Sequence, residues 1–270
     1  MNFTDKLTGA CSKNNSLVCI GLDPDPQKMP DGKGIIEFNR EIIEATSDLV
    51  CAYKLNFAFY EAQGEEGMDA LKRSVEHIPD HILKIGDAKR GDIGNTAKAY
   101  ARAIFDILGF DAATVNPYLG FDSIEPFLEY KDKGIFILCR TSNAGATDFQ
   151  SLLCQTESGN KPLYEIVALK AREWNTNSNI GLVVGATYPE ELRQIRQQHP
   201  DILLLIPGIG AQGGELEKAI RYGVDNNGGK AIINSSRQII YASHGKDFAL
   251  AARKAAMSLR DEINSCRTVT

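Results

Sequence analysis

The feature of this sequence that most limits its fold is a series of eight short apolar runs separated by stretches with helical periodicity. The runs cover residues 17–23, 49–54, 82–86, 112–116, 134–140, 180–185, 201–206 and 230–234. Short continuous apolar runs of this kind are typical of buried strands. Their alternation with helices predicts an α/β fold, a closed (β/α)8 TIM barrel that forms a single domain over residues 1–270. An open, doubly wound sheet is the alternative architecture.

The stretches between the runs predict helices at several places. Apolar spacing predicts one helix from Asn56 to about Val75 and a last one from about Lys246 to Ile263. Good helix formers begin at Thr96, so residues 90–95 are expected to form a turn between strand and helix. No linker or long-period repeat interrupts the chain of 270 residues, which supports one domain.

Composition and charge exclude several classes of function. The net charge of −5 and the absence of a basic patch argue against a nucleic-acid partner. No apolar run approaches the roughly 18 residues of a membrane span, and the first residues do not resemble a leader peptide. Six scattered cysteines without CxxC spacing indicate reduced thiols. We therefore expect a cytoplasmic protein with no membrane partner.

Charged and polar residues close several of the predicted strands: Asp23, Lys54, Asp87, Lys89 and Asn116. In a barrel these strand ends meet at one rim, where active sites are built. The two-residue period of a strand places Asp87 and Lys89 on one face. A structural salt-bridge cluster is the other interpretation of such a group. The convergence of so many ionisable residues favours a functional site.

Two later segments predict a phosphate site and a mobile loop. Glycines follow the seventh run, in Pro207-Gly208-Ile209-Gly210, and Arg237 follows the eighth. Glycine backbone amides and an arginine fork both suit a phosphate, and barrels often bind phosphate at these two loops. Residues 141–161 form a long segment after the fifth run, which predicts a lid on the same rim. A tolerated surface insertion is the alternative.

These residues together resemble a known family. The motif Asp87-x-Lys89-x-x-Asp92-Ile93 with Thr96 is similar to the signature of orotidine 5′-phosphate decarboxylases, in their longer bacterial branch. Asp23, Lys54 and the segment Pro207-Gly208-x-Gly210-x-Gln212 extend the resemblance over nearly the whole chain. Two positions depart from the pattern: Ala144 stands where proline is common, and Ser236 stands where the shorter branch usually has glycine.

The resemblance implies decarboxylation of orotidine 5′-monophosphate to uridine 5′-monophosphate and CO2, the last step of de novo pyrimidine nucleotide synthesis, without metal or organic cofactor. It implies that Lys89 donates the proton to C6, within a charged network of Asp87, Asp92 and Lys54. The substrate-binding residues that it implies are Asp23 at the ribose, Ser142 at the pyrimidine, and Gln212, Ser236 and Arg237 at the phosphate. Asp92 and Thr96 would reach into the partner's site, which implies a homodimer with shared sites.

Three other functions fit parts of the same pattern. A metal-dependent sugar-phosphate decarboxylase or aldolase of related barrel type has a similar third strand, but Lys54 repels a metal. A Schiff-base aldolase would need a neutral lysine, and the flanking acids keep Lys54 and Lys89 protonated. A non-catalytic barrel that binds a nucleotide phosphate would share the glycine loop and Arg237, but it has no need of Asp87, Lys89 and Asp92.

Overall fold

The computed structural model describes residues 2–157, 159–209 and 213–267. Eight parallel strands close into a barrel in the order β1-β10-β9-β8-β5-β4-β3-β2. The barrel strands are β1 (Val18–Gly21), β2 (Ala52–Asn56), β3 (Leu83–Arg90), β4 (Ala112–Val115), β5 (Gly134–Arg140), β8 (Ile180–Val184), β9 (Leu203–Ile206) and β10 (Ala231–Ser235). Each lies in one of the eight predicted runs or overlaps it. The (β/α)8 prediction is confirmed, and the open sheet is excluded because β1 pairs with both β2 and β10.

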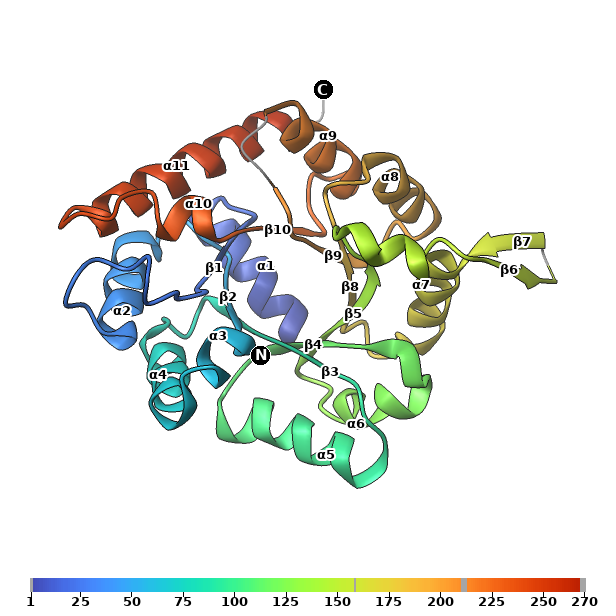
Figure 1. The fold of residues 1–270 in the computed structure, drawn as a ribbon. Helices are drawn as coiled ribbons and strands as arrows, with labels where there is room; N and C mark the ends of the chain where they lie inside the picture. The colour runs from blue at the N-terminus through green and yellow to red at the C-terminus, as the bar shows by residue number, and fades with distance from the viewer. Residues whose placement is uncertain (1, 158, 210–212, 268–270) are drawn as a thin grey trace.

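Helix α1 (Phe3–Asn14) lies across the ring of strands, and the other helices surround the ring, as Figure 1 shows. The surrounding helices are α2 (Ile35–Thr46), α3 (Phe57–Glu61), α4 (Gly64–His77), α5 (Gly94–Arg102), α6 (Glu125–Leu128), α7 (Leu163–Trp174), α8 (Pro189–Gln198), α9 (Gly213–Gly223), α10 (Arg237–Ile240) and α11 (Phe248–Arg267). The helix predicted from Asn56 to Val75 is two helices, because Gly64 has a φ of +63° that interrupts the helical path. Helix α5 begins two residues before the predicted Thr96.

Strand β3 continues beyond its predicted end at Gly86, through Arg90, so Arg90 is not part of a turn. Its pairing with β4 shifts register: Gly86 pairs with Ala113, whereas Arg90 pairs with Val115. Four steps along β3 therefore correspond to two steps along β4, which is a β-bulge. Within it Lys89 has a φ of +48°, a left-handed conformation that costs a non-glycine residue free energy. Regular strand alternation consequently does not apply between Gly86 and Arg90.

The interior of the barrel is a packed apolar core that α1 closes at the amino-terminal ends of the strands. Phe3 and Leu7 of α1 belong to the same buried cluster as Phe136, Leu203 and Ile85 of the strands. The rings of Phe3 and Phe136 meet edge to face, with centroids 5.9 Å apart. In Figure 1, α1 lies across the middle of the ring of strands. A second, larger apolar cluster packs the outside of the strands against the helices.

The segment predicted as a lid, residues 141–161, has secondary structure of its own. It contains the 3-10 helix η4 (Ala144–Asp148) and the antiparallel pair of β6 (Leu153–Thr156) with β7 (Gly159–Pro162). Figure 1 shows this hairpin projecting outward from the barrel. Whether any part of the segment closes over a ligand stays a prediction. In the part of the chain that the structure describes, no helix is long and apolar enough to cross a membrane.

Candidate active site

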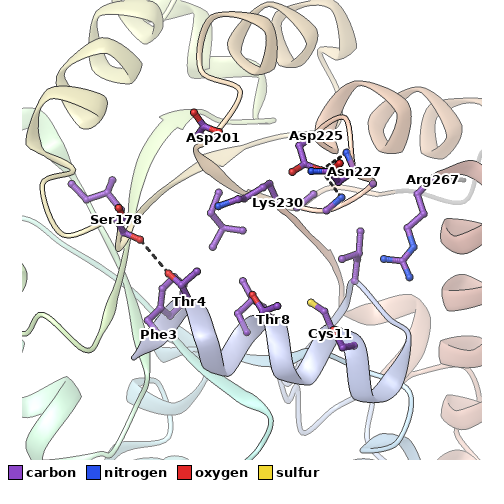
Figure 2. Close-up of a pocket in the computed structure, with 18 of the residues that line it drawn as sticks. Phe3, Thr4, Thr8, Cys11, Ser178, Asp201, Asp225, Asn227, Lys230 and Arg267 are labelled. Atoms are coloured by element: carbon purple, nitrogen blue, oxygen red, sulfur yellow. Dashed lines mark hydrogen bonds between the residues drawn. The ribbon is translucent and has the colours of Figure 1, made fainter. Parts of the chain in front are cut away.

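Two cavities lie at opposite ends of the barrel, and only one contains the predicted site residues. The larger, of about 470 Å³, lies between α1 and the amino-terminal ends of the strands, and Figure 2 shows Lys230, Asp225 and Asp201 across it from α1. The smaller, of about 290 Å³, lies at the carboxyl-terminal ends and is lined by Asp23, Lys54, Asp87, Lys89, Thr114, Leu138, Thr141, Ser142, Asn143, Val183, Leu205, Pro207 and Asn234. Because barrel enzymes react at the carboxyl-terminal face, the smaller cavity is the candidate site.

Four charged side chains, Asp23, Lys54, Asp87 and Lys89, form a continuous charge network along this cavity. The Lys54 Nζ lies 3.0 Å from Asp87 Oδ2 and 3.9 Å from Asp23 Oδ1. The Lys89 Nζ lies 2.6 Å from Asp87 Oδ1. Asp87 is therefore held between two ammonium groups, and negative and positive charges alternate from β1 to β3. Lys54 and Asp87 are buried, whereas the Lys89 side chain is 46% exposed and can reach a ligand.

The pKa values of the two buried members are shifted by this arrangement. Burial alone would raise the pKa of the Asp87 carboxyl, but the charges and hydrogen bonds of Lys54 and Lys89 outweigh it and hold the pKa well below the ordinary aspartate value. Burial alone would lower the pKa of the Lys54 ammonium, and the charges of Asp23 and Asp87 raise it above the ordinary lysine value instead. Both groups are therefore ionised at neutral pH.

Thr114 of β4 is a member of this site that the sequence interpretation missed. Its hydroxyl donates to Asp87 Oδ1 at 2.9 Å, and its Oγ1 accepts the backbone N–H of Lys89 at 3.0 Å. One side chain thus orients the carboxylate and also fixes the bulged backbone that carries the lysine. The only available signal was a hydroxyl residue in an apolar run, two residues before the strand's polar end at Asn116.

Ser142 lines the cavity, as the resemblance implies, between the loops that follow β8 and β9. A Cβ added at Gly185 would lie 2.8 Å from the Ser142 Cβ, and one added at Gly208 would lie 3.3 Å from its Oγ. Gly208 also has a φ of +86°, which an L side chain rarely adopts. The two glycines are thus required by the close approach of Ser142, in addition to any contact with an anion.

Of the residues implied at the phosphate that the structure describes, only Ser236 is in contact with the charge network. The Ser236 hydroxyl lies 2.7 Å from Asp23 Oδ2 and 2.9 Å from the Gly21 carbonyl, so it contacts the charge network directly. Arg237 begins α10 and is exposed; its guanidinium makes no ion pair or hydrogen bond with the residues that the structure describes. Gln212 lies outside the described residues.

Three other predicted residues do not reach this cavity. Asp92 accepts the backbone N–H of Ile93 at 2.8 Å, and Thr96 is exposed on the first turn of α5. Neither lines the cavity of its own chain. Asn116 is exposed and its Oδ1 accepts the Tyr118 N–H, so the prediction that it converges with the charged residues is wrong.

Asn234 of β10 lines the cavity instead, although in the sequence it is only the last residue of the eighth apolar run. Its side chain is buried, and its Oδ1 has no hydrogen-bond partner among the described residues. A polar residue at the end of the last apolar run was the one available signal.

Comparisons with known proteins identify the family of the chain. The family model described as "Orotidine 5'-phosphate decarboxylase / HUMPS family" matches residues 16–252. A curated orotidine 5'-phosphate decarboxylase of Dehalococcoides mccartyi is 57% identical over 267 residues, which cover 99% of each chain. One from Herpetosiphon aurantiacus is 53% identical over 261 residues, covering 95% of this chain and 96% of the relative.

Solved structures show the same fold over the full length. The structure of the OMP decarboxylase of Leishmania donovani superposes with a TM-score of 0.87 and 39% sequence identity, and the match covers 100% of both chains. The matched residues of the family model include every member of the charge network. The chain belongs to the orotidine 5′-phosphate decarboxylase family.

Proposed function

We propose that this protein decarboxylates orotidine 5′-monophosphate to uridine 5′-monophosphate and CO2, the last step of de novo pyrimidine nucleotide synthesis, and that the charge network carries out the reaction. The family match and the shared name of the curated relatives support the reaction. The observation that carries the residue assignment is the Lys89 ammonium, 2.6 Å from Asp87 and exposed to the cavity.

The chemistry asks for a cation at the reacting carbon. Loss of CO2 from C6 leaves a carbanion in a ring with no adjacent electron sink, so the site must stabilise that charge more than the substrate's carboxylate. Lys89 supplies the cation and then donates its proton to C6. Asp87 lies beside the leaving carboxylate and repels it, while Lys54 and Lys89 keep Asp87 ionised. A charge arrangement fixed before the substrate arrives needs no reorganisation during the reaction.

The remaining residues bind the parts of the substrate that do not react. Asp23 and Lys54 contact the ribose, Ser142 contacts the pyrimidine, and Gln212, Ser236 and Arg237 hold the phosphate. The Ser236 hydroxyl donates a hydrogen bond to Asp23, so this one bond links a residue at the phosphate to a residue at the ribose. Binding energy from the phosphate can in this way be used to order the site around C6.

Arg237→Ala is expected to raise KM for orotidine 5′-monophosphate strongly, because the guanidinium has no described intramolecular partner and is available for two phosphate oxygens. A charge-assisted pair of this kind is worth roughly 1.5–3 kcal/mol, so KM should rise by at least about tenfold. Steady-state kinetics measures this, with the exposed Arg73→Ala of α4 as control. An unchanged KM would contradict the phosphate assignment.

We also propose a two-fold dimer in which Asp92 and Thr96 complete the partner's site. Both residues lie on the rim but outside their own cavity. Four apolar side chains near them are exposed: Ile93, next to Asp92 in the chain, and Tyr118, Leu119 and Phe121 of the segment after β4, at 52%, 79%, 49% and 39%. Exposed apolar groups of this size mark interaction surfaces, which supports a second copy at this rim.

Mixing two inactive variants tests the shared site. Asp92→Ala subunits and Lys89→Ala subunits are each expected to be inactive as homodimers, whereas mixed dimers contain one site with neither substitution. Activity should therefore return after mixing, to about a quarter of the wild-type value for random exchange of subunits in a two-fold dimer. Native mass spectrometry of labelled subunits verifies exchange. Proven exchange without any recovery would count against the shared site.

The rival functions are separated by one assay. Rapid loss of orotate absorbance on adding the protein, unaffected by EDTA, supports a decarboxylase that needs no metal or organic cofactor. No change with a folded protein would instead favour sugar phosphates with Mg²⁺, or a binding module without turnover. The Lys54 ammonium already lies between Asp23 and Asp87, where a bridging metal would have to bind.

All six cysteines are free thiols, which supports a cytoplasmic location for this function.

A further inference from the structure

Gln150 ties the segment after β5 back onto its own beginning. Its Oε1 accepts the backbone N–H of Thr141 at 2.8 Å, and its Nε2 donates to Thr141 Oγ1 at 2.8 Å. The Thr141 hydroxyl in turn donates to Asn143 Oδ1 at 2.6 Å. A single amide therefore fixes both the main chain and the side chain of the residue that precedes Ser142.

A buried cation lies beneath this amide. Arg140 is 1% exposed, and its Nη1 lies 3.4 Å from both Gln150 Oε1 and the Thr141 carbonyl. Its Nε pairs with Glu191 of α8, and its guanidinium lies 3.9 Å from the centre of the Tyr188 ring. A planar guanidinium held by a carboxylate and a ring face has little freedom to turn. The Gln150 amide is thus hydrogen-bonded to Thr141 and also to the immobilised guanidinium of Arg140.

A bulge in β5 directs the Arg140 side chain away from the barrel interior. Leu138 pairs with Val183 and Arg140 pairs with Val184, so β5 has one extra residue at this point. Leu138 lines the cavity, whereas the Arg140 side chain packs against groups of α7 and α8. Arg140, the last residue of β5, therefore lies outside the cavity and contacts the segment that carries Ser142 through Thr141 and Gln150.

Ser142 packs closely against the main chain of the loops after β8 and β9. A Cβ added at Gly185 would lie 2.8 Å from the Ser142 Cβ, and one added at Gly208 would lie 3.3 Å from its Oγ, so Ser142 is enclosed on this side by glycine backbone. Its remaining freedom is set by the peptide it shares with Thr141. A displacement of about 1 Å of a group that positions a substrate can reduce turnover strongly.

From this geometry we infer that Gln150, anchored by Arg140, is a positioning residue that holds Ser142 for recognition of the pyrimidine base. The inference rests on the proposed contact between Ser142 and the base, and it deepens that proposal by naming what sets the contact. Gln150 does not line the cavity, so it acts on a ligand through the cavity-lining segment that it holds, residues 141–143, in which Ser142 is the residue assigned to the base.

The experiment compares two ligands that differ only by the base. Gln150→Ala is expected to weaken binding of uridine 5′-monophosphate by about tenfold, the effect of losing one oriented hydrogen bond, while binding of ribose 5-phosphate stays unchanged. Isothermal titration calorimetry measures both. Gln155→Ala, the same substitution on the exposed β6, should change neither affinity. Equal weakening of both ligands by Gln150→Ala would overturn the inference, because it would indicate general disorder of the site.

A double-mutant cycle with Ser142→Ala tests the route of the effect. If Gln150 acts through Ser142, adding Gln150→Ala to Ser142→Ala should weaken uridine 5′-monophosphate binding by less than twofold. A full tenfold effect in that background would overturn the inference and leave the Ser142 contact intact. An unchanged affinity in Ser142→Ala alone would overturn both.

Gln150→Glu keeps the test valid if the alanine variant does not fold. Glutamate has the same length, accepts from the Thr141 N–H and attracts Arg140, but it has no donor for Thr141 Oγ1. It should restore most of the affinity for uridine 5′-monophosphate, at least to within about threefold of wild type, because the main-chain contact is retained. A loss as large as that of Ser142→Ala would contradict the inference.

Discussion

Lys89→Ala is expected to reduce kcat for orotidine 5′-monophosphate by at least about 10³-fold, because the substitution removes both the proton donor and the cation beside C6. The reason lies in the geometry: the Lys89 Nζ is 2.6 Å from Asp87 and is the exposed end of the charge network. Without it, Asp87 keeps Lys54 as a partner at 3.0 Å, so the fold should be retained. Stopped assays with high enzyme concentration measure the residual rate.

The control for this variant is Lys98→Ala, since Lys98 is an exposed lysine of α5 that pairs with Glu129. It should leave kcat within twofold of wild type, as expected for a surface ion pair. Binding of uridine 5′-monophosphate should persist in Lys89→Ala, because the phosphate and base contacts remain. A near-normal rate in Lys89→Ala would remove this residue from the mechanism.

Lys54→Met is expected to lower the free energy of unfolding by about 3 kcal/mol and to abolish activity, since it leaves two carboxylates at a buried site without their shared cation. Methionine has a similar length, so the change removes charge more than volume. Lys54 Nζ is 3.0 Å from Asp87 and 3.9 Å from Asp23, and the Lys54 and Asp87 side chains are 7% and 9% exposed. Urea denaturation at about pH 7 measures the loss.

The destabilisation by Lys54→Met should shrink in acid. In the wild type, the lowered pKa of Asp87 contributes stability that is complete above the ordinary aspartate pKa. That contribution is lost as the pH falls from there toward the lowered pKa of the folded state. In the variant, burial is no longer offset by Lys54, so the Asp87 pKa rises and the carboxyl is protonated more readily in acid. The difference between the two proteins should therefore be larger at about pH 7 than at about pH 4.

Lys84→Met is the matched control for this measurement. Lys84 is also a buried lysine, at 9% exposed, but its described ionic partner is the fully exposed Asp80 at 3.5 Å. Its removal leaves no buried carboxylate unpaired, so the loss of stability should be smaller and should depend little on pH. Equal losses for Lys54→Met at the two pH values would show that the ion pairs with Asp23 and Asp87 are not the cause.

The barrel was predictable from sequence because parallel strands buried on both faces must be apolar along their length. Runs such as Ile180–Gly185 and Asp201–Ile206 therefore identify strands directly. The convergence of Asp23, Lys54, Asp87 and Lys89 followed from the fold, because all carboxyl-terminal strand ends lie at one rim.

What the sequence could not provide depends on bulges and on contacts between distant segments. The pairing of Asp87 with Lys89 was predicted from regular alternation, yet it is made through a bulge with Lys89 at a φ of +48°. Thr114 and Gln150 act through hydrogen bonds to residues on other segments, and no local pattern identifies their partners. The split between α3 and α4 likewise depends on one backbone angle, at Gly64.

The closure of the barrel by α1 determines how molecules enter and leave the protein. Phe3 and Leu7 pack against the interior side chains of the strands, and this layer separates the two cavities. The proposed reaction has one substrate and two products, a nucleotide and a gas. All three must therefore pass through the same opening of the cavity, at the carboxyl-terminal rim. Any movement that closed this opening would retain newly formed CO2 beside the nucleotide. The time at which the cavity reopens would then decide whether CO2 escapes or recombines with the carbanion at C6.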